Sequence, residues 1–420
     1  MLEYRTNMGK LIKIPMVIKT FGNSMFPLLL DGDVLYLKKI KFGKIRVNDI
    51  ITVKNKNNYF THRVIYKGNN FLVTKGDNNH ETDSKVYPKD IVGIVENVKR
   101  QGNIFNPEQI YLLQSSLYFA EIVKIKNILE KNKIEHVFLK GLPLHLYFEK
   151  THPRRIYADC DILIRPEDFP KIRTILKKFG YKKIEDSLSE KHKEIKNKES
   201  EISFAKLMNG FHVVFDIHFE IVFMMTQLGE LNALYPQEMI NSLTDDLIKE
   251  KRTINVQNEN FPILSATHLP LYLCLHLFHH NFIGPYRYDF INTVIGKNKL
   301  DEKKAIEIIK KYRLENFVYP CLFLLKKYYQ GPISNNILNS LKPPENTYKF
   351  IKENILNVDI LNEEERIGSG IKRFKMIFFL SPFPFYRKVL VFLNKEVLYS
   401  VFWVLYRKIN SYKNQNPLSL

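Results

Sequence analysis

A serine and a histidine within the first hundred residues could together perform nucleophilic catalysis. Ser24 lies in the stretch FGNSMFPLLLDGDVLYL, and His62 lies in YFTHRVIY. A serine hydroxyl is a weak nucleophile until a neighbouring base accepts its proton, and imidazole is the commonest such base. Asp77 and Asp83 follow in FLVTKGDNNHETDSKVYP, and either carboxylate could fix the histidine tautomer. This order of residues predicts a triad, although Ser24 by itself could equally be a turn residue.

A second set of candidate residues consists of three aspartates. Asp159 and Asp161 in RRIYADCDILIRPEDF are two residues apart, so on a strand their side chains would share one face, roughly 6.5–7 Å apart. Asp216 lies within the apolar stretch VVFDIHFEI, where a buried acid needs a partner. Carboxylates that converge in this way could hold one or two divalent cations for phosphoryl or nucleotidyl transfer. The pattern predicts a Mg²⁺ site, whereas the acid pair alone would suggest an exposed turn.

The stretch EHVFLKGLPLHLYF places Lys140 and Gly141 between an expected strand and an expected helix. Glycine lets the backbone approach a ligand closely, and the N–H groups at a helix N-terminus can bind a phosphate. The lysine adds a point charge. We therefore expect Lys140 and Gly141 to bind the nucleotide.

Several histidines in the second half of the chain have no firm role in the sequence. His218 follows Asp216 by two residues and could be a metal ligand or a structural residue. His276, His279 and His280 lie in LCLHLFHHNF, which could suggest a metal site. Because no matching set of partner residues is evident, helix packing or the edge of a substrate pocket is the simpler interpretation.

The elements that must position these residues fall into two patterns. Residues 1–100 contain short alternating stretches such as DVLYLKKI, DIITVKN, FTHRVIY and IVGIVENV, which predict a mostly-β domain. After a linker at 101–110, strands and helices alternate within residues 111–350, which predicts an α/β domain with a helical C-terminal part. We therefore expect a multi-domain protein.

Residues 351–420 form the last predicted unit, a basic and aromatic helical tail. Basic residues flank aromatic clusters in KMIFFLSPFPFYRKVLVFL and VLYSVFWVLYRK, a pattern that fits either a membrane-surface helix or a hairpin packed on the protein. Pro382 and Pro384 would interrupt a single spanning helix.

The charge of the chain indicates its binding partners, and its cysteines indicate its cellular compartment. The 64 lysines and arginines exceed the 44 acids and give a formal charge of +20, which favours nucleotides, nucleic acid or an anionic membrane as partners. Solvated lysine-rich faces would explain the same charge without a partner. Three widely spaced cysteines, no signal peptide and no uninterrupted apolar span predict a reduced, cytoplasmic protein, peripheral at most at the inner membrane surface.

The N-terminal motifs GNSMFPLLLDGDVLYL, THRVI and TKGDNNHETD resemble the signal peptidase I family over about residues 18–98, in its archaeal and endoplasmic-reticulum branch. The resemblance implies a mostly-β peptidase fold with Ser24 as nucleophile and His62 as general base. It implies Asp83, with Asp77 as second choice, as the residue that orients His62, and an oxyanion site on the backbone near Ser24. Members of the family usually carry a membrane helix before the serine. Only 23 residues precede Ser24 here, and they are not apolar enough to span a bilayer.

The motifs LKG, RIYADCDILI, KKFGY, FDIHFEI and LCLHLFHHNF resemble a family of poorly characterised nucleotidyltransferases over about residues 112–330. The resemblance implies Asp159, Asp161 and Asp216 as catalytic carboxylates that bind Mg²⁺, with a nucleoside triphosphate as substrate. Better-known relatives carry Gly-Ser where this chain has Lys140 and Gly141.

Three readings of function follow from these patterns. In the first, the chain is a bifunctional enzyme, a serine endopeptidase that cuts a peptide or protein and a nucleotidyltransferase, acting in peptide maturation. In the second, only the nucleotidyltransferase is active and the β domain binds peptides. In the third, the chain is a non-enzymatic nucleic-acid- or membrane-binding protein.

Overall fold

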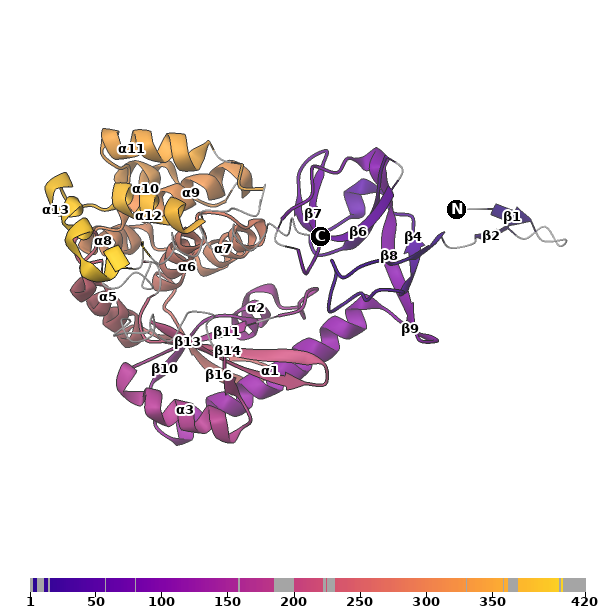
Figure 1. Cartoon of the computed structure of the whole chain (residues 1–420), viewed down its shortest axis with the longest axis horizontal. Helices are drawn as coiled ribbons and strands as arrows, with labels where there is room; N and C mark the ends of the chain where they lie inside the picture. The colour runs from indigo at the N-terminus through magenta and orange to yellow at the C-terminus, as the bar shows by residue number, and fades with distance from the viewer. Residues whose placement is uncertain are drawn as a thin grey trace, which may run out of the picture.

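The computed structural model has several domains, with two large sheets and many helices (Figure 1). It describes residues 3–5, 11–13, 16–56, 58–79, 81–157, 159–184, 200–221, 224, 231–329, 331–357, 359–361, 369–399 and 402. A small hairpin of β1 (Glu3–Arg5) and β2 (Leu11–Lys13) precedes the first large sheet.

The first sheet is antiparallel, with the strand order β3-β4-β8-β5-β6-β7 and with β9 paired to β8. Its strands are β3 (Met16–Lys19), β4 (Val34–Lys38), β5 (Ile50–Asn55), β6 (Asn58–Lys67), β7 (Leu72–Lys75), β8 (Ile91–Arg100) and β9 (Asn103–Phe105). Small apolar cores, which include Leu35, Ile51, Val64 and Val98, hold this unit together. We call residues 16–105 the β-rich unit.

The predicted linker at 101–110 is occupied mainly by ordered elements. β9 extends the sheet as far as Phe105, and α1 (Pro107–Lys131) begins two residues later. Asn106 and Gln109 form a capping box, and Pro107 stands in the first turn, where its missing N–H costs nothing. The chain therefore passes from sheet to helix within one residue.

The second sheet is mixed, with the strand order β12-β13-β14-β11-β10-β16-β15. Its strands are β10 (His136–Lys140), β11 (Asp159–Ile164), β12 (Lys182–Lys183), β13 (Glu201–Met208), β14 (Phe211–His218), β15 (Arg252–Val256) and β16 (Glu259–Ile263). The central strands β10, β11 and β14 are rich in buried apolar residues, as expected for strands covered on both faces. β11 pairs with β14 in parallel, so two distant stretches of sequence become neighbours.

Helices cover both faces of the second sheet. Figure 1 shows α1 and α3 (Phe169–Lys178) on one side and the helical half of the protein on the other. The helices of that half are α5 (Gln237–Lys249), α6 (His268–His279), α7 (Pro285–Asn298), α8 (Glu302–Lys311), α9 (Glu315–Tyr329), α10 (Asn335–Ser340), α11 (Glu345–Ile351), α12 (Ser369–Leu380) and α13 (Phe385–Val389). The short α2 (Leu142–Glu149) follows β10 and contacts it. One continuous apolar core joins this sheet to the helical half.

Part of the predicted C-terminal tail packs on the protein. Met376, Ile377 and Leu380 of α12 are buried in the main core, whereas Phe385 and Leu393 are more than two-thirds exposed. Residues 403–420 of the predicted tail lie outside the described residues. Within the described part of the chain, no helix combines the length and the apolar run needed to cross a bilayer.

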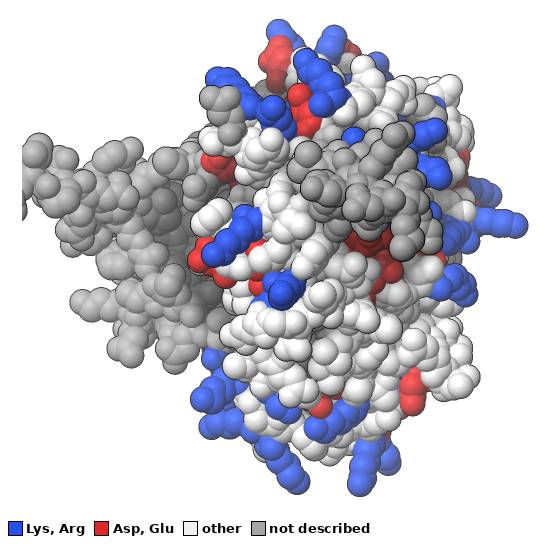
Figure 2. All heavy atoms as spheres, turned by 90° about the vertical axis from the view of Figure 1, so that its right-hand side faces the viewer, with Lys and Arg blue, Asp and Glu red and all other residues white. Residues whose placement is uncertain are grey.

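The basic side chains are scattered on the one face of the molecule that Figure 2 draws. Figure 2 shows the face of the β-rich unit, where lysines and arginines outnumber acids and lie scattered around the rim rather than in one patch. Cys160, Cys274 and Cys321 are all buried and free.

Candidate functional sites

Ser24, His62 and Asp83 come together in the β-rich unit. The Nε2 atom of His62 lies 3.1 Å from Ser24 Oγ, and its Nδ1 atom lies 2.6 Å from Asp83 Oδ2. His62 is 7% exposed, and Thr74 donates a second hydrogen bond of 2.7 Å to Asp83 Oδ2. The histidine can therefore contact the serine hydroxyl through one nitrogen while the carboxylate holds the other.

The loop that carries Ser24 is fixed by the turn after β7. The backbone N–H of Asn78 donates to the Ser24 carbonyl at 2.8 Å. A Cβ atom on Gly76 would lie only 2.6 Å from that carbonyl oxygen, so a side chain at this position would displace the loop. On the other side of the serine, Met25, Leu28 and Leu29 are buried and anchor the loop in the core.

Asp77, the second-choice orienting residue, faces a different partner. It accepts two hydrogen bonds from the Arg63 guanidinium, at 2.6 Å from Nε and 2.5 Å from Nη2. Successive residues of a strand point to opposite faces, so His62 and Arg63 on β6 address different carboxylates. Arg63 also donates to the Tyr111 hydroxyl at 2.8 Å and to the Arg154 carbonyl at 2.8 Å.

This Arg63 cluster links the β-rich unit to the rest of the chain, and sequence reasoning missed it. The available signal was a charged residue in the apolar strand stretch THRVI, which is costly to bury without partners. Two of its partners, Tyr111 and Arg154, lie beyond residue 105, so spacing alone could not identify them.

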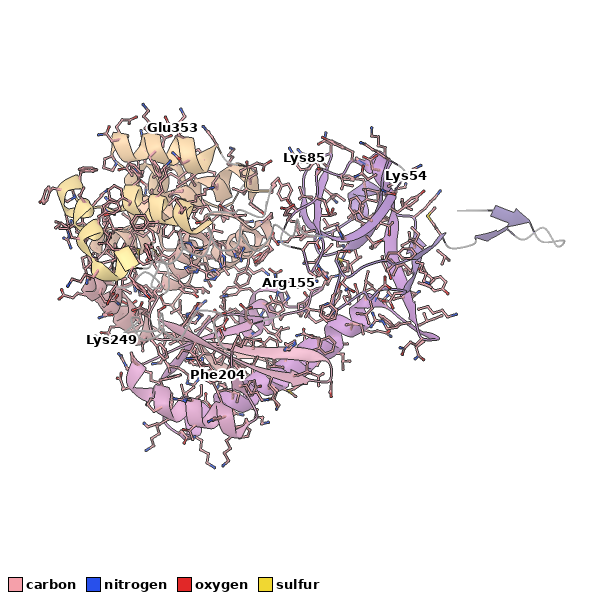
Figure 3. All side chains as sticks on the ribbon, viewed as in Figure 1. Lys54, Lys85, Arg155, Phe204, Lys249 and Glu353 are labelled. Carbon is pink, nitrogen blue, oxygen red and sulfur yellow. The ribbon has the colours of Figure 1, made fainter. Side chains whose placement is uncertain are left out.

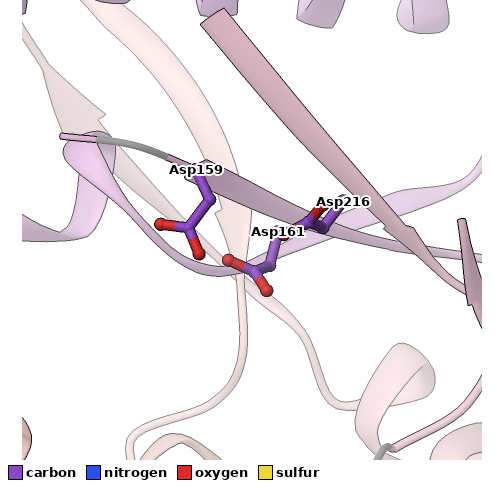
Figure 4. A group of neighbouring side chains, drawn as sticks. All are labelled: Asp159, Asp161 and Asp216. Carbon is purple, nitrogen blue, oxygen red and sulfur yellow. The ribbon is translucent and has the colours of Figure 1, made fainter. Parts of the chain in front are cut away.

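Asp159, Asp161 and Asp216 form the second site (Figure 4). Each offers a carboxylate oxygen, and these three atoms all lie within 4.8 Å of one another. The parallel pairing of β11 and β14 places Asp161 directly beside Asp216, while Asp159 lies two residues earlier on the same face. The sheet thus joins carboxylates that are 55 residues apart in the sequence.

Positive groups partly compensate this cluster. Lys140 Nζ lies 3.1 Å from Asp159 Oδ2 and 3.1 Å from Asp161 Oδ1, and His218 Nε2 lies 2.9 Å from Asp161 Oδ1. Burial would raise the pKa of Asp161, but Lys140 and His218 outweigh it and lower this pKa. Burial and the charge of Asp161 instead raise the pKa of Asp216 to about 6.

The donor set fits a divalent cation. Asp161 Oδ2 and Asp216 Oδ1 are buried, and neither has a hydrogen-bond partner among the described residues. Carboxylate oxygens are the ligands that Mg²⁺ prefers, and a cation would satisfy both orphaned atoms.

Gly141 lies where the backbone must pass close to the carboxylate strand. Its φ is +105°, and a Cβ atom would lie 3.2 Å from the Asp159 carbonyl oxygen. It ends β10 and caps α2, directly after Lys140. Both residues line the same cavity of about 430 Å³ as the three aspartates.

The remaining histidines of interest also line this cavity. His276, His279 and His280 are partly buried on or just after α6, and the rings of His276 and His280 are 4.7 Å apart. Burial and nearby cations lower the pKa of all three, that of His279 to about 3. They are therefore uncharged at neutral pH, and within the described residues they belong to no group of three or more metal-ligating side chains.

The segment that contains the three aspartates matches a known family. Residues 106–330 match the family model described as "Uncharacterised nucleotidyltransferase". A crystal structure of the lincosamide antibiotic adenylyltransferase LnuA, lincomycin-bound, is 16% identical, covering 42% of this chain and 94% of that one, with a TM-score of 0.27. A TM-score this low supports no conclusion about this chain's substrate. No protein with a curated description matches the chain. Because the family match spans more than half of the 420 residues and includes all three aspartates, the chain belongs to this family of uncharacterised nucleotidyltransferases.

Proposed function

We propose that the chain transfers a nucleotidyl group from a nucleoside triphosphate to an acceptor in a reaction that requires a divalent cation. The supporting observation is the pair of orphaned buried oxygens on Asp161 and Asp216 beside Asp159. Mg²⁺ held by these carboxylates would neutralise phosphate charge and align the reacting oxygen. In the overall reaction a bond forms between the acceptor oxygen and the α-phosphorus, the α–β anhydride bond breaks, and pyrophosphate leaves.

The chain's own residues would bind and orient the nucleotide. Lys140 already contacts two of the aspartates, and its charge would attract a phosphate bound beside the cation. The glycine at 141 lets the backbone after Lys140 pass close to β11, because a Cβ there would meet the Asp159 carbonyl oxygen. His218 fixes the Asp161 carboxylate through its hydrogen bond.

Transfer of a label from α-labelled ATP, CTP, GTP or UTP to small molecules or peptides of a cell extract tests this proposal. We expect Mg²⁺-dependent product with the wild-type chain and a loss of about 100-fold or more in Asp161→Asn. Asp168→Asn is the matched control, because Asp168 pairs with the exposed Lys171 and is not among the residues that line the aspartate cavity. Product that forms equally in Asp161→Asn would count against the proposal.

A second activity is favoured by a separate observation, the contacts of His62 with Ser24 and Asp83. We propose that the β-rich unit is a serine endopeptidase of the signal-peptidase type. His62 Nε2 would accept the Ser24 proton as Oγ attacks a peptide carbonyl, and would then give it to the leaving amine. Asp83 would hold the imidazole and stabilise its cationic form, and water would release the acyl group from Ser24.

A fluorophosphonate probe tests the second activity. We expect labelling of the wild-type chain that disappears in Ser24→Ala and persists in Ser84→Ala, since Ser84 is an exposed serine beside the same site. Asp83→Asn should slow labelling by about 10²–10⁴-fold. Asp77→Asn should slow it much less, because Asp77 bonds Arg63 and not His62. Labelling that is unchanged in Ser24→Ala would leave the β-rich unit as a peptide-binding module.

A further inference from the structure

Two arginines line the same cavity as the three aspartates, and the proposed function gives them no role. Arg155 belongs to the segment that leads into β11, and Arg287 lies in the first turns of α7. Figure 3 shows Arg155 at the junction of the β-rich unit, the second sheet and the helical half. Neither arginine forms an ion pair with a carboxylate of the described residues, although both lie near a strongly acidic cluster.

Aromatic rings hold these guanidinium groups in place. The Arg155 guanidinium carbon lies 4.6 Å from the Tyr157 ring centre and 5.2 Å from that of Tyr286, and Arg287 lies 4.5 Å from the same Tyr286 ring. Stacking uses the flat face of a guanidinium and leaves its N–H groups at the edge free to donate. Arg287 uses one of these donors on the Ile283 carbonyl at 3.2 Å, and the Arg155 guanidinium uses one on the Tyr157 side chain, so each group keeps further N–H donors.

The neighbouring Arg154 has a structural role, in contrast to Arg155. Its guanidinium contacts Asp49 at 2.7 Å and Glu108 at 3.0 Å, so two carboxylates satisfy it. Its carbonyl accepts a hydrogen bond from Arg63. The β-rich unit and α1 therefore fix Arg154, and this anchoring sets the position of Arg155 beside the cavity.

The cavity is thus lined by acidic side chains and by basic side chains. The aspartates suit a divalent cation, and the two stacked arginines suit a multiply charged anion with planar, bidentate hydrogen bonding. The three histidines that line the same cavity are uncharged, whereas the two arginines and Lys140 are positively charged and His218 is held by its hydrogen bond to Asp161. A polyphosphate that carries a divalent cation has both of the complementary groups.

We propose that Arg155 and Arg287 form the subsite for the β- and γ-phosphates of the nucleotide, and hence for the pyrophosphate that leaves. This assignment rests on the proposed nucleotidyl transfer and deepens it. It also makes the β-rich unit part of the nucleotide site, because that unit anchors Arg155 through Arg154.

Calorimetric titration of the full chain with inorganic tripolyphosphate and Mg²⁺ tests the subsite. We expect Arg155→Gln and Arg287→Gln each to weaken binding by about 10- to 100-fold. Arg155→Lys should lose less affinity than Arg155→Gln, because lysine keeps the positive charge. It should still bind more weakly than wild type, because it lacks the planar guanidinium. Arg173→Gln, an exposed arginine on α3, is the matched control and should bind as wild type. Thermal unfolding of each variant identifies any that fails to fold, and the lysine variant then decides.

Three outcomes would overturn the inference. One is equal tripolyphosphate binding by wild type, Arg155→Gln and Arg287→Gln; another is no binding by wild type at all. The third is occupation of the arginines by a single-stranded oligonucleotide that tripolyphosphate does not displace. Equal binding combined with Asp161-dependent transfer would refute only the subsite. Arginine-dependent binding without any nucleotide turnover would instead refute the proposed transfer.

Discussion

The carboxylate cluster carries an electrostatic cost at the level of single residues. Burial and the Asp161 charge raise the pKa of Asp216 from 3.8 to about 6. A shift of one pKa unit corresponds to 1.36 kcal/mol, so at neutral pH the ionised Asp216 destabilises the metal-free fold by about 1–3 kcal/mol. A cost of this kind is common where a site is built for a ligand rather than for stability.

Asp216→Asn should therefore stabilise the metal-free protein at pH 7 while it abolishes nucleotidyl transfer. The gain should shrink as the pH falls from about 6 towards 4. In that range the folded wild type takes up a proton on Asp216, while the unfolded chain remains ionised until its lower, ordinary pKa. Thermal unfolding in a chelator from pH 4 to 8 measures this difference. If Asp216→Asn is less stable than wild type at pH 7, ionised Asp216 does not destabilise the metal-free fold.

The sequence identifies most candidate residues by type but not their pairing. Three aspartates near two apolar strands were enough to predict a cation site. Spacing alone left both Asp77 and Asp83 open as the partner of His62, and only the family resemblance favoured Asp83, because the choice depends on the path of the turn after β7. That turn brings Asp83 N–H to the Thr74 carbonyl at 2.8 Å and Asp77 to Arg63.

At the scale of elements, the turn after β7 positions the Ser24 loop. Gly76→Ala should push this loop away from His62, because the added Cβ would meet the Ser24 carbonyl at 2.6 Å. A displacement of about 1 Å can cost about 100-fold in rate, so we expect probe labelling to fall by about that factor. Gly43→Ala is the matched control, since nothing lies within 4 Å of its added Cβ. Unchanged labelling in Gly76→Ala would show that the turn after β7 does not determine the position of the Ser24 loop.

The strands predicted in the first hundred residues appear as β4 to β8, since alternating apolar residues and turn signals are local features. β9 occupies part of the predicted linker because three residues with no clear alternation pair with β8. The parallel pairing of β11 and β14 could not be predicted from the sequence. It joins residues that are 55 positions apart in the sequence and depends on how the whole sheet packs.

At the scale of the whole molecule, the Arg63 cluster joins the β-rich unit to the nucleotidyltransferase part. Arg63→Met leaves Asp77 without its bidentate partner and removes the bonds to Tyr111 and Arg154. We expect a loss of about 3–5 kcal/mol and a calorimetric unfolding profile in which the β-rich unit unfolds separately.

Arg100→Met is the matched control for this coupling. Arg100 makes a bidentate pair with Asp33 entirely within the β-rich unit. Loss of this pair should destabilise the β-rich unit. The Arg63 contacts remain in this variant, so the unit should still unfold together with the rest of the chain. Identical calorimetric profiles for the two variants would show that Arg63 contributes no coupling between the units.

The most direct test of the central claim is Mn²⁺ binding to the full chain, followed by electron paramagnetic resonance, because it needs no knowledge of the acceptor. Wild type and Asp168→Asn should bind the ion with equal affinity. Asp161→Asn and Asp216→Asn should each bind it about 10-fold or more weakly, since each removes a carboxylate ligand. Wild type that binds no Mn²⁺, or Asp161→Asn that binds it as well as wild type does, would contradict a cation site at these three aspartates.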